Sequence, residues 1–467
     1  MCLGRLVALS FLLCSSISAQ QLQWSEPIII NSGNLNSSGV RPRIAIDSQN
    51  NPLIIWGKTG SQKNIHFSRI EGGAFTPPVA LLLEDINPHI STFSGPEIAV
   101  KSDTVYIVFS GLNSLEEEHI YLLKSTNGGV DFSDAIQVDN LTYGKAVMPH
   151  IAISSGGNPV VSFMHVNSNW TETNHMITQS YNGAISFEEI VSASSLSGNN
   201  PCECCFSKVV CDEDRYAVVF RDNDDNIRNM HASLSTNNGE SFETFINLND
   251  QDWVLEACPD AGPDAYLIGN HLFSVWRSGS SGNPLIHYAK LNLNSYVLEE
   301  RGIIDEVFSI FQKFPDLSGN TDTILAVWTD NRYGSNDCFI SYSTDGMTTW
   351  SDSEAFSDTL ISNTFSEPDV AYANGKIHVV YRNVTQQKVL YRTGQIVYPN
   401  SILENKNSYL NILDEEVEWG REVDFELFNL EGKMVVKGKS HKLSLIGLPN
   451  SIYILKTPTS VHKFIKE

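Results

Sequence analysis

The chain of 467 residues combines 31 lysines and arginines with 54 aspartates and glutamates, for a formal charge of −23. This acidic surplus argues against nucleic acid and anionic membrane surfaces as partners, because both would be repelled. Charged residues make up only 18% of the chain, while Ser, Asn, Thr and Gly are abundant, a composition typical of many short strands joined by polar turns.

Residues 1–19 read as a signal peptide. Arg5 gives the positive start, Leu6 to Cys14 the apolar stretch, and Ile17-Ser18-Ala19 the small-residue cleavage site. The apolar stretch is too short to span a bilayer, and no later segment holds about 18 continuous apolar residues. We therefore expect a secreted or cell-surface protein without a transmembrane segment.

One pattern recurs in residues 20–397: a Ser is followed seven residues later by an aromatic residue, with a tight polar turn between them. We call these segments boxes, and they begin at Ser68, Ser125, Ser180, Ser235 and Ser343. An Asp or Asn at the third position can accept hydrogen bonds from N–H groups of the turn, and the aromatic residue can pack between sheets. The boxes resemble the Asp boxes, or BNR repeats, of the sialidase superfamily, although several carry Asn for Asp and the first carries Ile70.

Each box belongs to a longer unit of four predicted strands in about 54 residues, which is typical of the blades of a β-propeller. The first strand of each unit is expected to begin after a proline. These prolines are Pro42, Pro96, Pro149, Pro201, Pro263, Pro315 and Pro368. The last unit lacks a box, and Trp24 to Ile30 supplies the missing strand. The sequence therefore predicts an all-β, seven-bladed propeller closed by its N-terminal strand, with six blades, the number usual in sialidases, as the alternative.

Residues 398–467 differ in composition and are predicted to form a small β-sandwich. The segments Leu427 to Lys433, Leu448 to Ile454 and Lys463 to Lys466 resemble the type A C-terminal sorting domain of the type IX secretion system. The resemblance implies that this domain engages the type IX machinery and carries no catalysis. An ordinary accessory sandwich is the alternative.

Three arginines occupy equivalent positions after the second strand of their units: Arg221, Arg277 and Arg382. We expect them on the face opposite the boxes. Arginine is suited to bidentate capture of a carboxylate or sulfate, and sialidases use three arginines on a sugar carboxylate. The alternative is that each arginine pairs with an acidic neighbour.

The residues that follow the prolines are expected on the same face. They are Arg43, Glu97, His150, Cys202, Asp264, Asp316 and Asp369. Such a set suits general acid–base chemistry or, through Glu97, Asp316 and Asp369, a structural divalent cation. It is equally compatible with side chains that cap strand ends.

Six cysteines follow the signal peptide, and four of them fall in two loops that are expected to be neighbours. In an exported protein we expect disulfides among Cys202, Cys204, Cys205 and Cys258. A thiolate metal site near His150 or His231 is the alternative.

The predicted function is binding of a glycan or another acidic ligand on the face opposite the boxes. The alternative is an exo-acting glycoside hydrolase of sialidase type. The Arg-Ile-Pro motif of sialidases is absent, the nearest text being Val40 to Ile44, and Tyr381 and Tyr333 are nucleophile candidates by position only. No catalytic residue is assigned.

Overall fold

The computed structural model describes residues 21–31, 39–307, 311–357, 363–397, 410–413, 416–429, 433–449, 451–457 and 460–466. The signal peptide predicted for residues 1–19 lies outside these ranges. The chain divides into two compact units, Gln23–Gln395 and a second one that includes Ile396–Glu467. Every regular element of the described residues is a β-strand, which confirms the all-β class. Those residues include no helix long and apolar enough to cross a membrane.

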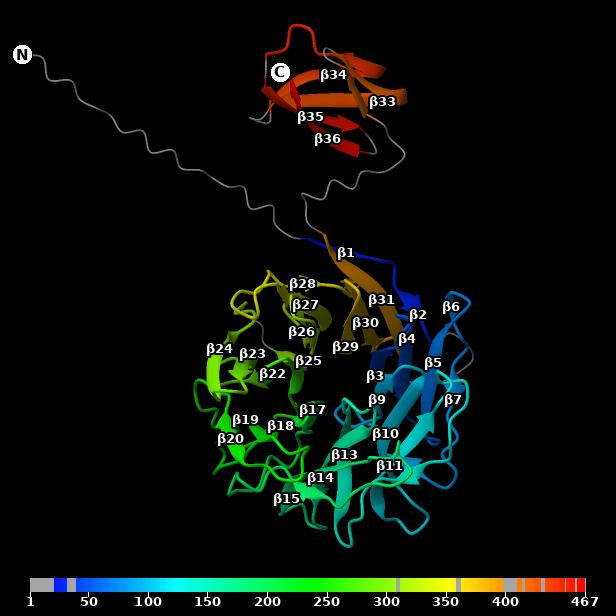
Figure 1. Cartoon of the computed structure of the whole chain (residues 1–467), viewed down its shortest axis with the longest axis vertical. Helices are drawn as coiled ribbons and strands as arrows, with labels where there is room; N and C mark the ends of the chain where they lie inside the picture. The colour runs from blue at the N-terminus through cyan, green and yellow to red at the C-terminus, as the bar shows by residue number, and fades with distance from the viewer. Residues whose placement is uncertain are drawn as a thin grey trace, which may run out of the picture. The chain divides into compact units, whose positions relative to one another are not determined.

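The described part of the larger unit forms seven sheets that follow one another along the chain (Figure 1). The first sheet contains β3 (Gly39–Ile46), β4 (Pro52–Lys58), β5 (Asn64–Glu71), β6 (Ala74–Phe75) and β7 (Val79–Ala80). The second contains β8 (Asn87–Pro88), β9 (Glu97–Lys101), β10 (Thr104–Leu112), β11 (Glu118–Ser125) and β12 (Ile136–Gln137). The third contains β13 (Lys145–Ile153), β14 (Pro159–Val166), β15 (Thr173–Gln179) and β16 (Val191–Ser192).

The remaining sheets repeat the same antiparallel order. The fourth contains β17 (Lys208–Asp212), β18 (Arg215–Arg221), β19 (Met230–Ser235) and β20 (Thr244–Asn247). The fifth contains β21 (Asp264–Ile268), β22 (His271–Ser278), β23 (Leu285–Asn292) and β24 (Val297–Ile303). The sixth contains β25 (Gln312–Gly319), β26 (Ile324–Asp330), β27 (Asp337–Ser343) and β28 (Glu354–Ala355). The seventh contains β29 (Phe365–Ala373), β30 (Lys376–Asn383), β31 (Lys388–Val397), β1 (Gln21–Trp24) and β2 (Ile28–Ile29).

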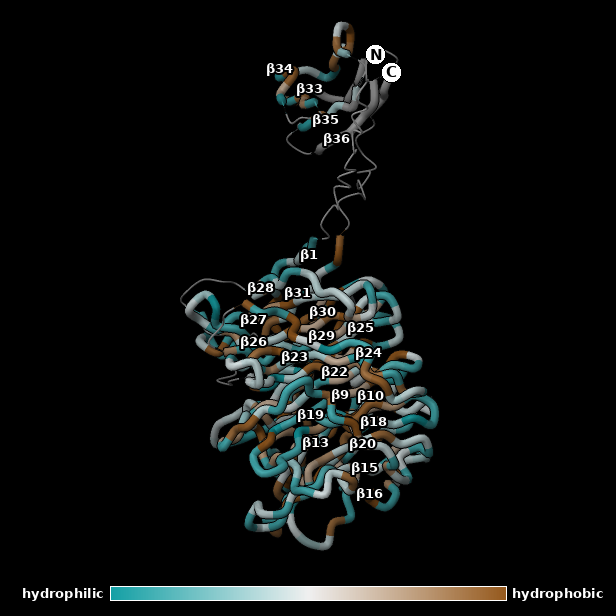
Figure 2. Tube along the Cα trace, turned by 90° about the vertical axis from the view of Figure 1, so that its left-hand side faces the viewer, coloured by the Kyte–Doolittle hydropathy of each residue, from teal (hydrophilic) through white to brown (hydrophobic). Residues whose placement is uncertain are grey.

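The sheets pack face to face in a ring. The first strands β3, β9, β13, β17, β21, β25 and β29 contact one another in this order, and β29 contacts β3. In Figure 1 the labelled strands of this set lie toward the middle of the unit. Each second strand is covered on both sides, so it reads as a continuous apolar run. In β4, Ile55 packs toward the second sheet and Ile54 and Trp56 toward the seventh, and brown hydrophobic segments accordingly alternate with teal loops in Figure 2.

The N-terminal strand completes the seventh sheet, as predicted. Both β1 and β2 pair with β31, and the N–H group of Ser25 donates to the carbonyl of Thr393 at 2.8 Å. Trp24 packs against Phe356 with ring centroids 5.4 Å apart, and its Nε1 donates to Glu354 at 2.8 Å. Residues from the two ends of the unit therefore form one sheet.

The four boxes with Asn or Asp at the third position have the turn hydrogen bonds that their sequence predicts. In the second box, Asn127 Oδ1 accepts from the N–H groups of Val130 and Asp131 at 3.1 and 3.0 Å. Its final residue, Phe132, packs edge-on against Phe67 of the first sheet, with centroids 5.2 Å apart. The boxes therefore stabilise the turns and the contacts between sheets.

The second unit contains one described sheet. Its strands are β32 (Leu410–Leu413), β33 (Glu416–Asn429), β34 (Met434–Ser444), β35 (Ser451–Thr457) and β36 (Ser460–Lys466). The long strand β33 pairs with β32, β34 and β35, so the strands predicted as a sandwich are linked into a single sheet. Its small apolar core includes Phe425, Leu427, Leu443 and Leu455.

Candidate functional site

The first strands share an irregularity at the end opposite the boxes. In β3, β13, β25 and β29 the register shifts at the proline, so these strands begin before the proline and not after it as predicted. A proline lacks an N–H group and is accommodated at a bulge. The preceding residues have positive φ angles: Arg41 (49°), Met148 (53°), Phe314 (54°) and Glu367 (57°). Such angles are rare for non-glycine residues, are disfavoured before proline and cluster at functional sites.

Glu97 lies between two guanidinium groups on the first strands. Its Oε1 is 2.7 Å from Arg41 Nη2 and its Oε2 is 3.1 Å from Arg43 Nε. Burial alone would raise the pKa of Glu97, but the charges of Arg43 and Arg41 outweigh it and lower the pKa to about 2. Arg43 also lies 3.5 Å from Asp369, so it supplies the positive charge that a divalent cation would bring to these carboxylates.

Three of the predicted aspartates bind backbone N–H groups of the following sheet. These hydrogen bonds run from Leu317 N to Asp264 Oδ2 (2.7 Å), from Val370 N to Asp316 Oδ2 (2.9 Å) and from Ile44 N to Asp369 Oδ2 (2.7 Å). The other oxygen of Asp264 lies 2.6 Å from Lys208 Nζ. The carboxylates thus join neighbouring first strands. This matches the alternative from the sequence, in which these side chains cap strand ends.

Asp316 lies next to two other carboxylates, and replacing it with Asn should not destabilise the chain. Burial and the charges of Asp369 and Asp264 raise the pKa of Asp316 well above its ordinary value. Its contribution to stability is therefore full below the unfolded pKa and is lost as the pH rises through the folded pKa. Asp316→Asn keeps the oxygen acceptor and removes the charge. We expect the free energy of unfolding at pH 8 to stay constant or rise by about 1 kcal/mol, with a smaller change at pH 4. Urea unfolding measures this, and a loss above about 2 kcal/mol would contradict the assignment.

His150 is neutral and buried. Only 7% of it is exposed, and its Nδ1 has no hydrogen-bond partner among the described residues. Burial and the charge of Lys208 keep the pKa of His150 well below its ordinary value. The side chain therefore offers an unprotonated imidazole at neutral pH.

The three equivalent arginines have different environments. Arg221 is fully buried and donates to the carbonyl oxygens of Arg228 and Arg277, both at 2.7 Å. Arg382 donates to Glu367 Oε1 at 2.9 Å, which matches the alternative in which an arginine pairs with an acid. Arg277 is partly exposed and donates to the carbonyl of Pro259 at 2.8 Å. Of these three arginines, only Arg277 is partly exposed and makes no hydrogen bond to a carboxylate among the described residues.

Arg277 and Lys313, which we call the cationic patch, meet at the ring of Phe311. Arg277 Cζ lies 5.5 Å and Lys313 Nζ 5.7 Å from its centroid. Within the described ranges neither forms an ion pair. Burial lowers the pKa of Arg277, and Arg221 lowers it further; burial and Arg277 lower the pKa of Lys313, with Asp260 acting in the opposite direction. Sequence reasoning missed Lys313, because the equivalent positions two residues before the other prolines carry no charge and the repeat gives no signal there.

A disulfide joins two loops near this patch. Cys204 and Cys258 are bonded, with Cα atoms 6.2 Å apart, so the loop before β17 is linked to the loop before β21 as predicted. Cys202 and Cys205 are buried free thiols whose sulfurs are 3.3 Å apart. His231 stacks on Phe245 at 4.4 Å, and the described cysteine groups that could hold a metal do not include His150 or His231.

The tyrosines considered as nucleophiles have other settings. Tyr381 is 1% exposed and packs between Phe356 and Phe365. Tyr333 is exposed and lies over Phe339, with centroids 5.7 Å apart. A core tyrosine cannot reach a sugar, so Tyr381 is not a nucleophile in this conformation.

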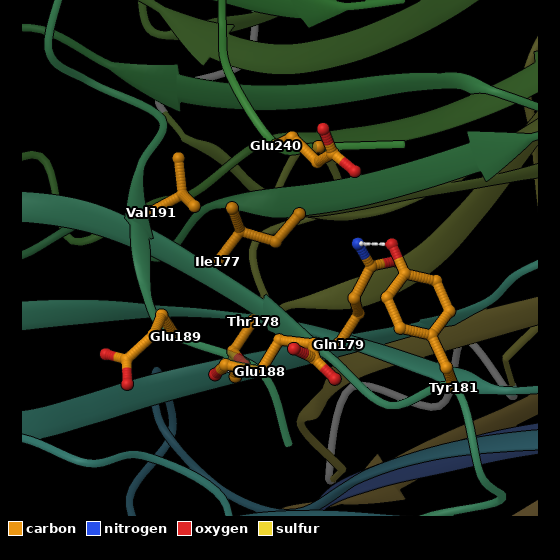
Figure 3. Close-up of a pocket in the computed structure, with 9 residues that line it drawn as sticks. Ile177, Thr178, Gln179, Tyr181, Glu188, Glu189, Val191 and Glu240 are labelled. Carbon is orange, nitrogen blue, oxygen red and sulfur yellow. Dashed lines mark hydrogen bonds between the residues drawn. The ribbon is translucent and has the colours of Figure 1, made fainter. Parts of the chain in front are cut away.

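A groove of about 220 Å³ opens along the third sheet, on the side of the boxes (Figure 3). Tyr181, Glu188, Glu189 and Glu240 line it, and Gln179 donates to the Tyr181 hydroxyl at 2.7 Å. Its three carboxylates would repel an anionic ligand. The groove is therefore opposite in charge to the cationic patch.

No protein-family model and no curated protein matches the sequence. Solved structures do match. The BP39L lectin of Burkholderia pseudomallei has a TM-score of 0.58 at 10% identity, over 77% of this chain and 96% of the lectin. A PL25 ulvan lyase bound to -[GlcA(1-4)Rha3S]- gives 0.52 at 11% identity, over 78% and 95%, and the Hadza microbial sialidase Hz136 gives 0.48 at 12% identity, over 80% and 69%. At such identities the likeness to the lectin and to the ulvan lyase concerns the fold alone, an all-β arrangement of consecutive antiparallel sheets.

Proposed function

We propose that the protein is an exported propeller that binds an acidic glycan, carrying carboxylate or sulfate groups, at the cationic patch. The observation that carries this proposal is the pairing of Arg277 with Lys313 without an ion-pair partner among the described residues. Two cations therefore lie side by side on a chain whose formal charge is −23. Their partly desolvated charges favour an anion.

The ring of Phe311 adds a second element of sugar recognition. It lies under both cations, so it offers an apolar surface beside charged donors, a combination common in ligand sites. The ulvan lyase supports the choice of ligand class, because its bound oligosaccharide is acidic, and the lectin supports a binding role on this fold.

The same proposal includes the architecture of the chain and its export from the cell. The seven sheets are seven blades of one propeller, because β29 packs against β3 and the N-terminal strands complete the last sheet. Residues 1–19 direct export, and residues 398–467 form the sorting domain that engages type IX secretion machinery.

Binding is preferred over hydrolysis of sialidase type. A retaining glycosidase needs a nucleophile and an acid beside the sugar, and the two candidate tyrosines lie in the core or over Phe339. The cationic patch by itself supplies binding and orientation.

The test is a comparison of acidic and neutral oligosaccharides. Calorimetry on the full chain should detect a uronic-acid or sulfated oligosaccharide and not its neutral counterpart, and the affinity should fall as salt increases. Equal affinity for both sugars would refute the proposal, and release of a reducing end would favour the hydrolase.

A further inference from the structure

Four cysteines bring their sulfur atoms together at the start of the fourth sheet. The Cys204–Cys258 disulfide lies beside the thiol pair of Cys202 and Cys205. Cys202 Sγ is 3.6 Å from Cys204 Sγ and 3.3 Å from Cys205 Sγ. A free thiol therefore contacts one sulfur of a disulfide and, at the same time, a second thiol.

The hydrogen bond with Cys205 and burial raise the pKa of Cys202 far above its ordinary value, so the negative charge of the buried pair rests on Cys205. Arg228 Nη1 lies 3.1 Å from Cys202 Sγ. Burial alone would raise the pKa of the Cys205 thiol, but the hydrogen bond from Cys202 and the charge of Arg221 outweigh it and bring the pKa to about 7. Thiolates attack disulfides, and Cys205 Sγ lies 3.3 Å from Cys202 Sγ, so the Cys205 thiolate can take the proton of Cys202 as Cys202 attacks Cys204. Arg221 makes no ion pair with a carboxylate in the described residues, so a Cys205 thiolate also compensates its buried charge.

The disulfide reaches from this buried pair to solvent. Cys202 and Cys205 are fully buried, whereas Cys258 is exposed. Asp260 Oδ1 lies 3.2 Å from Cys258 Sγ, where it can accept a hydrogen bond from a released Cys258 thiol. Because Cys202 contacts Cys204, attack by Cys202 releases Cys258, whose sulfur is exposed so that water can solvate it, and Asp260 then accepts a hydrogen bond from the protonated Cys258 thiol.

We propose that these four cysteines form a thiol–disulfide exchange site in which one disulfide moves between the Cys204–Cys258 and Cys202–Cys205 pairs. In the first step the proton of Cys202 passes to the Cys205 thiolate, and Cys202 Sγ attacks Cys204 Sγ. The Cys204–Cys258 bond breaks, and its electron pair leaves on Cys258 Sγ. In the second step the proton of Cys205 moves to the Cys258 thiolate, Cys205 Sγ attacks Cys202 Sγ, and the Cys202–Cys204 bond breaks with its electron pair on Cys204, which leaves as a thiolate. One disulfide is present throughout, so no external oxidant or reductant is consumed.

The exchange changes which segments are linked. The Cys204–Cys258 bond ties the loop before β17 to the loop before β21, whereas a Cys202–Cys205 bond lies within the first loop. The second loop contains Pro259, whose carbonyl accepts from Arg277. Exchange therefore frees the segment that positions Arg277 and exposes a Cys258 thiol to small or protein thiols and disulfides. This site does not depend on the identity of the glycan.

Native alkylation without reductant tests the proposal. The full chain is incubated with iodoacetamide at pH 7.5 and quenched with acid, and its cysteine peptides are mapped by mass spectrometry. We expect Cys258 to become alkylated with time while a Cys202–Cys205 or Cys202–Cys204 disulfide appears. In Cys202→Ser, alkylation of Cys258 should be at least about tenfold slower, because no internal thiol contacts the disulfide. Cys211→Ser, which removes a free thiol outside the cluster, should behave like the wild type.

If the Cys202→Ser chain does not fold, the cysteine peptides of the wild-type chain still test the exchange proposal. Two closed disulfides in the isolated protein, Cys204–Cys258 and Cys202–Cys205, would make the cluster a purely structural staple and overturn the proposal. So would a Cys258 that stays unlabelled while Cys202 and Cys205 react as thiols after unfolding. A stoichiometric metal ion that protects all four sulfurs from alkylation would replace exchange with metal binding.

Discussion

Glu97→Gln should lower the free energy of unfolding at pH 7 by about 3–5 kcal/mol, the cost of breaking a buried ion pair from one side. The substitution keeps the shape and removes the charge that separates Arg41 from Arg43. Those guanidinium groups, at side-chain exposures of 4% and 14%, would then repel each other. Urea unfolding followed by tryptophan fluorescence measures the loss.

The pH dependence of this loss follows from the lowered pKa of Glu97. Its folded pKa is about 2 against an ordinary value of 4.5. A lowered carboxyl pKa contributes stability that is present above the unfolded value and is lost as the pH falls through the folded value. The difference between the wild type and Glu97→Gln should therefore be full above pH 5 and shrink toward pH 2.

Glu71→Gln is the matched control. Glu71 pairs with Arg69 at 3.1 Å, but 65% of its side chain is exposed, so its removal should cost at most about 1 kcal/mol. If Glu97→Gln costs no more than Glu71→Gln, the buried cluster does not hold the first strands together.

The double substitution Arg277→Gln/Lys313→Gln should weaken binding of an acidic oligosaccharide about 100-fold or more. A hydrogen bond to a charged group contributes about 1.5–3 kcal/mol, and each cation supplies at least one such bond. The folded state should tolerate the change, because the pKa of each cation is lowered by burial and by a neighbouring cation. Calorimetry gives the dissociation constants, and thermal unfolding shows that the variant is folded.

Arg69→Gln/Lys101→Gln is the control for net charge. It removes the same two residue types at the end of the sheets where the boxes lie. Its affinity should stay within about twofold of the wild type, since the effect of distant charges is screened at physiological salt. An equal loss in both double variants would mean that long-range attraction, and not the cationic patch, governs binding.

The features that could be predicted from sequence are local or repeated. The turn hydrogen bonds of a box form between residues a few positions apart, as between Asn127 and Asp131, so the local sequence predicts them. The constant spacing of the boxes predicted that the sheets repeat along the chain. The missing strand of the last unit pointed to residues near Trp24, which do pair with β31. Such patterns depend on neighbours in the chain or on a count of units.

The candidate site depends on contacts between sheets, which the repeat does not encode. Arg221, Arg277 and Arg382 are equivalent in sequence, yet one is buried on carbonyl groups, one is partly exposed and one is paired with Glu367. The aspartates after the prolines face N–H groups of the next sheet, and this pairing follows from the ring. The positive φ of Phe314 and Glu367 likewise arises from bulges that a proline permits but does not require.

The most direct test of the account is the position of the ligand. In a crystal of the full chain soaked with an oligosaccharide containing a uronic acid, carboxylate oxygens should lie within about 3.2 Å of both Arg277 and Lys313, with the sugar ring against Phe311. A sugar found instead in the acidic groove at Tyr181 and Glu240, with the cationic patch empty, would contradict it.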